Sequence, residues 1–109
     1  MTGKIDRQVD QGFDGREVSL RVGESLVLSL PENPTTGFTW EIHETGSPAC
    51  ALRDTVFDPP TAGVGRGGTR RWRFEAVQAA TSTLALVYRR ASEDRPPARR
   101  FRLTIRVDQ

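Results

Sequence analysis

The sequence contains one cysteine and one histidine, the two residue types that could supply a nucleophile and its general base. Cys50 and His43 are seven residues apart, and His43 ends a segment that alternates like a β-strand. Covalent catalysis also needs a third group and a pocket arranged around the substrate. The sequence offers no paired carboxylates in a plausible cleft, no phosphate-binding loop and too few Cys and His residues for a four-ligand zinc site. We therefore expect no enzyme, metal or cofactor.

A second group of residues is suited to binding, and it occupies one loop. It consists of Asn33, Pro34, Thr35, Thr36, Gly37 and Phe38. Proline fixes φ, β-branched threonine restricts χ1, and glycine permits the positive φ that turns the chain back into a strand. A loop with so little freedom loses little conformational entropy when it binds. The same composition also suits an ordinary turn between strands, so both interpretations stay open here.

A glycine cluster forms a second candidate loop. It runs through Gly65, Arg66, Gly67, Gly68 and Thr69. Backbone without Cβ atoms can approach another chain closely and offer its own N–H and C=O groups. Taken alone, the cluster is equally typical of a flexible turn.

The elements that must position these loops are β-strands, because period-two alternation dominates and no segment has a convincing helical period. Strands are predicted at residues 17–22, 25–30, 39–42, 71–76, 84–88 and 100–107, with weaker ones at 4–9 and 52–57. We expect tight hairpin turns at Gly23–Glu24 and at 79–81. Seven to eight short strands at this spacing predict an all-β, immunoglobulin-like antiparallel β-sandwich.

The order of the strands also predicts where the loops lie. If successive strands run in opposite directions, every second connection lies at the same end of the sandwich. The long connections at 31–37, 58–68 and 89–99 alternate in this way, so we expect them to cluster, with the 43–51 connection at the opposite end. Loops held by a rigid scaffold are where binding function concentrates.

Length and composition limit the remaining possibilities. The 109 residues suit a single domain over 1–109, in which 1–16 form a marginal N-terminal strand or arm. No stretch approaches the roughly 20 apolar residues of a membrane span, so no membrane association is expected. Residues 1–10 lack the apolar run of a secretory signal. This predicts a cytoplasmic protein as the sequence stands, or a periplasmic or secreted one if Met1 replaces a removed signal peptide.

The run from Asn33 to Phe38, followed by Trp40, resembles the signature of the chagasin-type inhibitors of papain-like cysteine peptidases. The glycine cluster resembles the Gly-x-Gly-Gly loop of that family, and the resemblance extends over most of the chain from about Glu17. The third family motif, Arg-Pro-Trp, is matched only in part. Arg89 and Arg90 follow Tyr88 as at the start of that loop, but Ala91 and Ser92 stand in place of Pro and Trp.

The resemblance implies a reversible inhibitor that occludes the active-site cleft of a papain-like cysteine protease with three loops and is not cut. Thr35 and Thr36 would lie nearest the catalytic cysteine and histidine, and Asn33 and Pro34 would hold the loop's shape. The protease-binding set so implied comprises residues 33–38, 65–69 and 89–92. The change at Ala91 and Ser92 affects the expected affinity and selectivity. We expect a monomer, which suits a protein that must enter a cleft.

Charge distribution leaves a different function open. Residues 1–63 carry a net charge of −5 and residues 64–109 a net charge of +7. One sheet face could therefore carry a basic stripe of Arg70, Arg71, Arg73, Arg99, Arg100, Arg102 and Arg106. Nucleic-acid binding would use such a stripe together with exposed aromatic rings. Because Trp72, Phe74 and Phe101 alternate with the arginines, they should point inward, and we expect no nucleic-acid partner.

A generic immunoglobulin-like interaction domain is the remaining alternative, because a fold does not fix a function. It would predict that changes at Thr35, Thr36 or Gly67 leave function unaffected.

Overall fold

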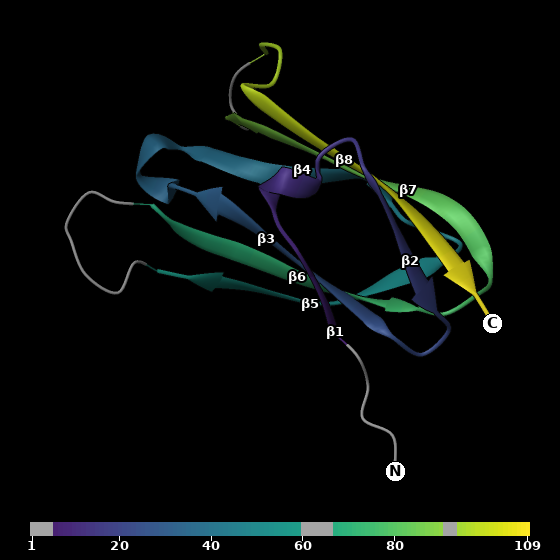
Figure 1. Ribbon diagram of the computed structural model, residues 1–109. Coiled ribbons are helices and arrows are strands. Elements are labelled where there is room, and N and C mark those ends of the chain that lie inside the picture. Colours follow the sequence, from purple (N-terminus) through teal and green to yellow (C-terminus); the bar gives the residue numbers. More distant parts are fainter. Residues whose placement is uncertain (1–5, 60–66, 91–93) are drawn as a thin grey trace.

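Eight strands and two short 3₁₀ turns make up the computed structural model, which describes residues 6–59, 67–90 and 94–109 (Figure 1). The strands are β1 (Asp6–Val9), β2 (Glu17–Arg21), β3 (Ser25–Glu32), β4 (Phe38–Thr45), β5 (Cys50–Asp58), β6 (Gly68–Ala76), β7 (Ala80–Arg90) and β8 (Arg99–Asp108). The turns are η1 (Gln11–Phe13) and η2 (Pro34–Thr36). The predicted all-β fold with eight strands is confirmed.

The strands form two four-stranded sheets that pack face to face (Figure 1). Sheet A has the order β1-β3-β6-β5, and sheet B has the order β2-β8-β7-β4. Within each sheet the odd-numbered strands run one way and the even-numbered strands the other. The edge pairs β1–β3 and β2–β8 are therefore parallel, and the other four pairs are antiparallel. The sheets are thus mixed, where the sequence had predicted antiparallel pairing throughout.

The core lies between the sheets and is built from the inward positions of the alternating segments. Its largest fully buried side chains are Leu26, Leu28, Leu30, Phe74, Leu84, Leu86, Phe101, Leu103 and Ile105. Burying one such side chain contributes about 1.5–3 kcal/mol to the free energy of folding. The apolar side chains along each strand therefore determine which of its faces points inward. Trp72, Phe74 and Phe101 are all buried, as their alternation with arginines predicted.

Two turns that were predicted as hairpins instead carry the chain from one sheet to the other. Gly23 and Glu24 join β2 of sheet B to β3 of sheet A, and residues 77–79 join β6 of sheet A to β7 of sheet B. Either arrangement keeps the apolar faces of both strands inward, so alternation alone cannot distinguish them. Among the described strands the hairpins are β5–β6 and β7–β8.

The predicted basic stripe is wrong, because its arginines belong to different sheets. Arg70, Arg71 and Arg73 lie on β6 in sheet A, whereas the other four arginines lie on β8 in sheet B. On sheet A the arginines are neutralised by carboxylates: Arg73 makes two bonds to Asp6 (2.8 and 3.0 Å), and Arg71 pairs with Asp58.

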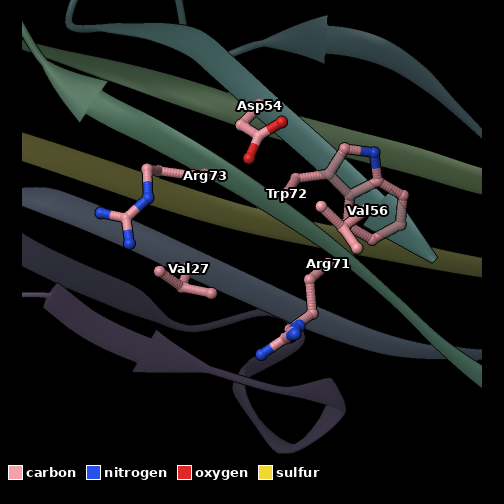
Figure 2. Close-up of a pocket in the computed structure, with 6 residues that line it drawn as sticks. All are labelled: Val27, Asp54, Val56, Arg71, Trp72 and Arg73. Carbon is pink, nitrogen blue, oxygen red and sulfur yellow. The ribbon is translucent and has the colours of Figure 1, made fainter. Parts of the chain in front are cut away.

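A hollow of about 190 Å³ lies on sheet A, and the arginines of these two ion pairs belong to its lining (Figure 2). Val27, Asp54 and Val56 line it together with Arg71, Trp72 and Arg73. Trp72 is buried, so the hollow offers no ring on which a base could stack. The nucleic-acid interpretation therefore lacks both of its structural requirements on this sheet.

No helix in the described part of the chain is long and apolar enough to cross a membrane. Among the same residues there is no group of three or more His, Cys, Asp or Glu side chains that could hold a metal ion.

Candidate functional site

The connections β3–β4, β5–β6 and β7–β8 lie at one end of the sandwich, as the strand order predicted (Figure 1). We call residues 33–38 the central loop, 65–69 the glycine loop and 89–98 the third loop. The central loop crosses from sheet A to sheet B, and the end of β5 and start of β6 in sheet A lie at the same end of the sandwich as the end of β7 and start of β8 in sheet B. The described residues around the loops lie close together. Asn33 N donates to the hydroxyl of Tyr88, the residue before the third loop, at 3.0 Å, and a Cβ built on Gly67 would lie 3.0 Å from Asn33 Cβ.

The central loop is closed by hydrogen bonds within itself. The Asn33 side chain accepts hydrogen bonds from Thr35 N (3.2 Å) and from the Thr35 hydroxyl (2.6 Å), so Asn33 acts as the N-cap of η2. The Asn33 carbonyl accepts bonds from Thr36 N (3.2 Å) and from the Thr36 hydroxyl (2.7 Å). These four bonds fix the loop between Asn33 and Thr36 and leave the outer sides of Pro34, Thr35 and Thr36 exposed to solvent.

Gly37 returns the chain to the sheet. Its φ is +80°, in the left-handed region that residues with a Cβ rarely adopt. Its N–H donates to Pro34 O at 3.0 Å. The glycine predicted for this turn is therefore required by the backbone. Phe38 then begins β4 opposite Arg90 of β7.

A buried carboxylate holds the base of the central loop. Glu32 ends β3 and is only 2% exposed. One of its oxygens accepts a hydrogen bond from Trp40 N (3.3 Å), across the loop on β4. The other accepts bonds from Arg70 Nε (3.3 Å) and Nη2 (3.0 Å) on β6. Trp40 Nε1 also donates to Pro31 O at 2.9 Å. This bond connects β3, which leads into the central loop, with β4, which follows it.

An aromatic row lies beneath the loop. The Tyr88 ring lies between Trp40 and Phe38, with centroid distances of 4.8 and 5.4 Å. The Arg90 guanidinium carbon lies 4.8 Å from the Phe38 ring centroid, and Arg90 Nε donates to Thr36 O at 2.9 Å. The central loop is therefore fixed to β7 as well as to itself.

Two hollows lie beside the central loop. The first, of about 300 Å³, separates it from the glycine loop and is lined by Pro31, Glu32, Asn33, Gly67, Gly68, Tyr88 and Arg99. The second, of about 310 Å³, lies toward the third loop and is lined by Phe38, Arg89, Arg90, Arg95, Pro96 and Ala98. The site is thus a stiff projecting loop with a concave surface on each side.

The predicted site residues fall into two groups. The structure describes all of 33–38, Gly67 just before β6, Gly68 and Thr69 in the first two positions of β6, and Arg89 and Arg90 at the end of β7. Arg89 Nη1 lies 3.8 Å from Glu41 Oε1, so these two side chains form an ion pair between β7 and β4 of sheet B. Gly65, Arg66, Ala91 and Ser92 lie outside the described residues.

Sequence reasoning missed Glu32, Arg70 and Tyr88 as parts of this site. A signal for Glu32 was present, because it continues the inward positions of Leu26, Leu28 and Leu30 by two residues. A carboxylate at an inward position must be paired, and this could have indicated a buried ion pair. Its partner could not be identified from the sequence, because Arg70 is 38 residues away along the chain.

The cysteine and the histidine do not form a catalytic pair. His43 is exposed on β4 and lies 3.6 Å from Glu41, whereas Cys50 is buried at the start of β5. The β4–β5 connection is at the end opposite the three loops, where Val77 N donates to Ala49 O at 2.8 Å.

The Cys50 thiol is expected to be inert in the folded protein. Burial raises its pKa from 9.0 to about 11, because desolvation disfavours the thiolate, which is the reactive form. Ellman's reagent at pH 8 should therefore react slowly with native protein and completely after unfolding in guanidinium. As pH rises from 9 to 11 the unfolded thiol loses its proton first, so the free energy of unfolding should fall over that range. Complete labelling of native protein within minutes would contradict this.

A small β-sandwich with a stiff loop between two hollows at one end belongs to the class of binding proteins that act through loops on a rigid scaffold. The family model described as "Chagasin family peptidase inhibitor I42" matches residues 19–107. The chain therefore belongs to the chagasin family of peptidase inhibitors, and it is an inhibitor and not an enzyme.

Individual relatives agree with this assignment. Chagasin of Trypanosoma cruzi is 28% identical over 91 residues, which cover 79% of this chain and 83% of that protein. The crystal structure of a cysteine protease inhibitor from Entamoeba histolytica covers 99% of this chain and 100% of its own, with a TM-score of 0.84 and 16% identity. PbICP-C, solved in complex with falcipain-2, covers 96% of this chain and 91% of its own, with a TM-score of 0.58 and 17% identity. The two structures support the fold.

Proposed function

We propose that this protein is a reversible inhibitor of papain-like cysteine proteases and that its central loop covers the catalytic cysteine and histidine of the target. Family membership supplies the class of activity. The cysteine protease inhibitor and the falcipain-2 complex among its structural neighbours support the class of partner. The arrangement of the central loop supports the mechanism.

The observation that carries the mechanism is that carbonyl groups along the central loop are engaged within the inhibitor. Asn33 O accepts from Thr36, Pro34 O accepts from Gly37 N, and Thr36 O accepts from Arg90 Nε. Attack by a thiolate needs a carbonyl that is free to move into the target's oxyanion-stabilising donors. With these three carbonyls engaged, the peptides that follow Asn33, Pro34 and Thr36 are poor substrates, so the loop can occupy the cleft, block substrate and resist being cut.

The flanking loops extend the contact on both sides. We assign the glycine loop, Gly65 to Thr69, to one side of the target's cleft and the third loop, at Arg89, Arg90, Ala91 and Ser92, to the other. A protease–inhibitor contact of standard size buries about 1,600 Å² in total, which needs more than a single loop. Because the central loop is preformed, we expect tight binding to be expressed mainly as slow dissociation.

The test is a titration of papain and of a cathepsin-L-type protease with the purified protein and a fluorogenic peptide substrate. The parent should inhibit reversibly at a stoichiometry of one to one. Thr36→Asp should raise Ki by about tenfold or more, because it places a charge at the exposed tip beside the target's thiolate. The matched control is Thr81→Asp, an exposed threonine at the opposite end of the sandwich.

Inhibition by the parent and by Thr81→Asp, with a large loss in Thr36→Asp, would establish both the activity and the central loop. If the parent leaves both proteases fully active at micromolar concentration, general inhibition of papain-like enzymes is ruled out. If both aspartate variants inhibit as well as the parent, the inhibitory surface lies elsewhere.

A further inference from the structure

The C-terminal end of β7 contacts the central loop at two points, through Tyr88 and through Arg90. In the register of sheet B, Trp40 faces Tyr88 and Phe38 faces Arg90, so the last residues of β7 run alongside the strand that leaves the loop. Tyr88 and Arg90 are two residues apart and therefore project on the same face of β7. That face is turned toward the central loop, as the contacts of both side chains show.

Tyr88 fixes the beginning of the loop. Its hydroxyl accepts a hydrogen bond from Asn33 N at 3.0 Å, in a half-buried position. The ring is held between Phe38 and Trp40, which leaves the hydroxyl little freedom to move away. Asn33 is the residue whose side chain and carbonyl accept the four bonds that close the loop. The position of the whole turn therefore depends on the Tyr88 hydroxyl.

Arg90 fixes the end of the loop. Its Nε donates to Thr36 O at 2.9 Å while its guanidinium carbon lies 4.8 Å from the Phe38 ring centroid. A Cβ added to Gly37 would lie 3.6 Å from Arg90 Nε, so the arginine side chain runs along the peptide that joins Thr36 to Gly37. The bond to Thr36 O thus engages the carbonyl of the peptide just past the exposed tip.

We infer that Tyr88 and Arg90 are positioning residues that lock the central loop in its inhibitory conformation and keep the Thr36–Gly37 peptide from being cut. The inference rests on the proposed function and deepens it. Arg90 matches a residue of the third family motif, yet these contacts of its side chain are made to the inhibitor's own central loop. One rigid strand end therefore holds both ends of the turn, so loosening either contact frees the loop while the sandwich stays folded.

Conservative variants isolate each contact. Tyr88→Phe keeps the ring between Phe38 and Trp40 and removes only the hydroxyl. Arg90→Lys keeps the positive charge and removes the Nε donor and the planar group over Phe38. Each should raise Ki by about 3- to 10-fold, the loss expected for one hydrogen bond. The matched control is Arg106→Lys, an exposed arginine of β8 that is not among the site residues.

Three readouts distinguish positioning from general stability. The melting temperature of each variant should stay within a few degrees of the parent. In the free protein, amide exchange at Thr36 and Gly37 should accelerate about tenfold, with the core strands unchanged. During prolonged incubation with papain, mass spectrometry should detect cleavage within residues 33–38 of Tyr88→Phe and Arg90→Lys, and none in the parent or in Arg106→Lys.

Faster loop exchange with weaker inhibition and new cleavage supports the inference. Unchanged loop exchange in both variants overturns it, as does faster exchange with unchanged Ki and an intact loop. If the parent fails to inhibit any protease tested, the proposed function falls, and the positioning role is then decided by loop exchange in the free protein alone.

Discussion

Replacing Glu32 by alanine should lower the free energy of unfolding by about 3 kcal/mol, near the lower limit for breaking a buried ion pair from one side. The Glu32 side chain is 2% exposed, whereas that of Arg70 is 30% exposed and can recover some hydration. Without the carboxylate, Trp40 N also loses its side-chain acceptor at the base of the central loop. Both changes act where β3, β4 and β6 meet, so we expect the central loop to lose its fixed orientation as well.

Equilibrium denaturation in urea, monitored by tryptophan fluorescence, measures this effect. Arg70→Met removes the other partner, and the double variant Glu32→Leu/Arg70→Met replaces the pair with apolar side chains. The double variant should be more stable than Glu32→Ala, because it leaves no uncompensated charge. If Glu32→Ala lowers the free energy of unfolding by less than about 1 kcal/mol, the Glu32–Arg70 ion pair contributes little, because an exposed ion pair contributes that much.

The sequence predicted the strands well because each strand has one apolar face, and burial of that face dominates the energetics. Leu26, Leu28 and Leu30 on β3 are all fully buried, as alternation requires. The same alternation does not specify which strand lies beside which. For that reason the turn at Gly23–Glu24 was predicted as a hairpin, whereas β2 pairs with β8 and β3 with β1 and β6.

The charge asymmetry of the sequence has an explanation that only the fold provides. Acidic residues of the first half pair with arginines of the second half within the same sheet, either on adjacent strands or across one intervening strand. The pairs include Asp6–Arg73, Glu32–Arg70, Glu44–Arg102 and Asp58–Arg71. Two halves with net charges of −5 and +7 therefore compensate each other within one sandwich, and the basic half does not in itself indicate an acidic partner.

The central loop was predictable as a stiff turn because Pro34, the two threonines and Gly37 act through local backbone geometry. The contacts that hold this turn in place were not predictable, because they join residues about 55 positions apart. Asn33 meets Tyr88, and Thr36 meets Arg90, through the pairing of β4 with β7. Local chemistry thus indicated the candidate loop, and strand pairing determined how it is supported.

A second large effect is expected at Gly68, the first residue of β6. A Cβ there would overlap the Asp58 carbonyl oxygen and would lie 2.7 Å from Phe57 Cζ. The closest obstacle is backbone, which cannot move aside as a flexible side chain does, so the end of β5 must separate from β6. Gly68→Ala should lower the free energy of unfolding by about 2–3 kcal/mol, toward the upper part of the range for overpacked sites. Inhibition should weaken as well, because the glycine loop leaves the sheet at this residue.

The matched control is Gly12→Ala, where the nearest obstacle is the Asp10 side chain at 3.1 Å and no atom of the described parts of the three loops lies within 4 Å. Urea denaturation and Ki should both stay close to the parent in this control. In Gly68→Ala, unchanged stability would show that β5 accommodates the methyl group without separating from β6. Gly68 also pairs with Glu32 in the β3–β6 register. The losses in Gly68→Ala and Glu32→Ala should therefore be less than additive in the double variant, because each disrupts the same junction beneath the central loop and the glycine loop.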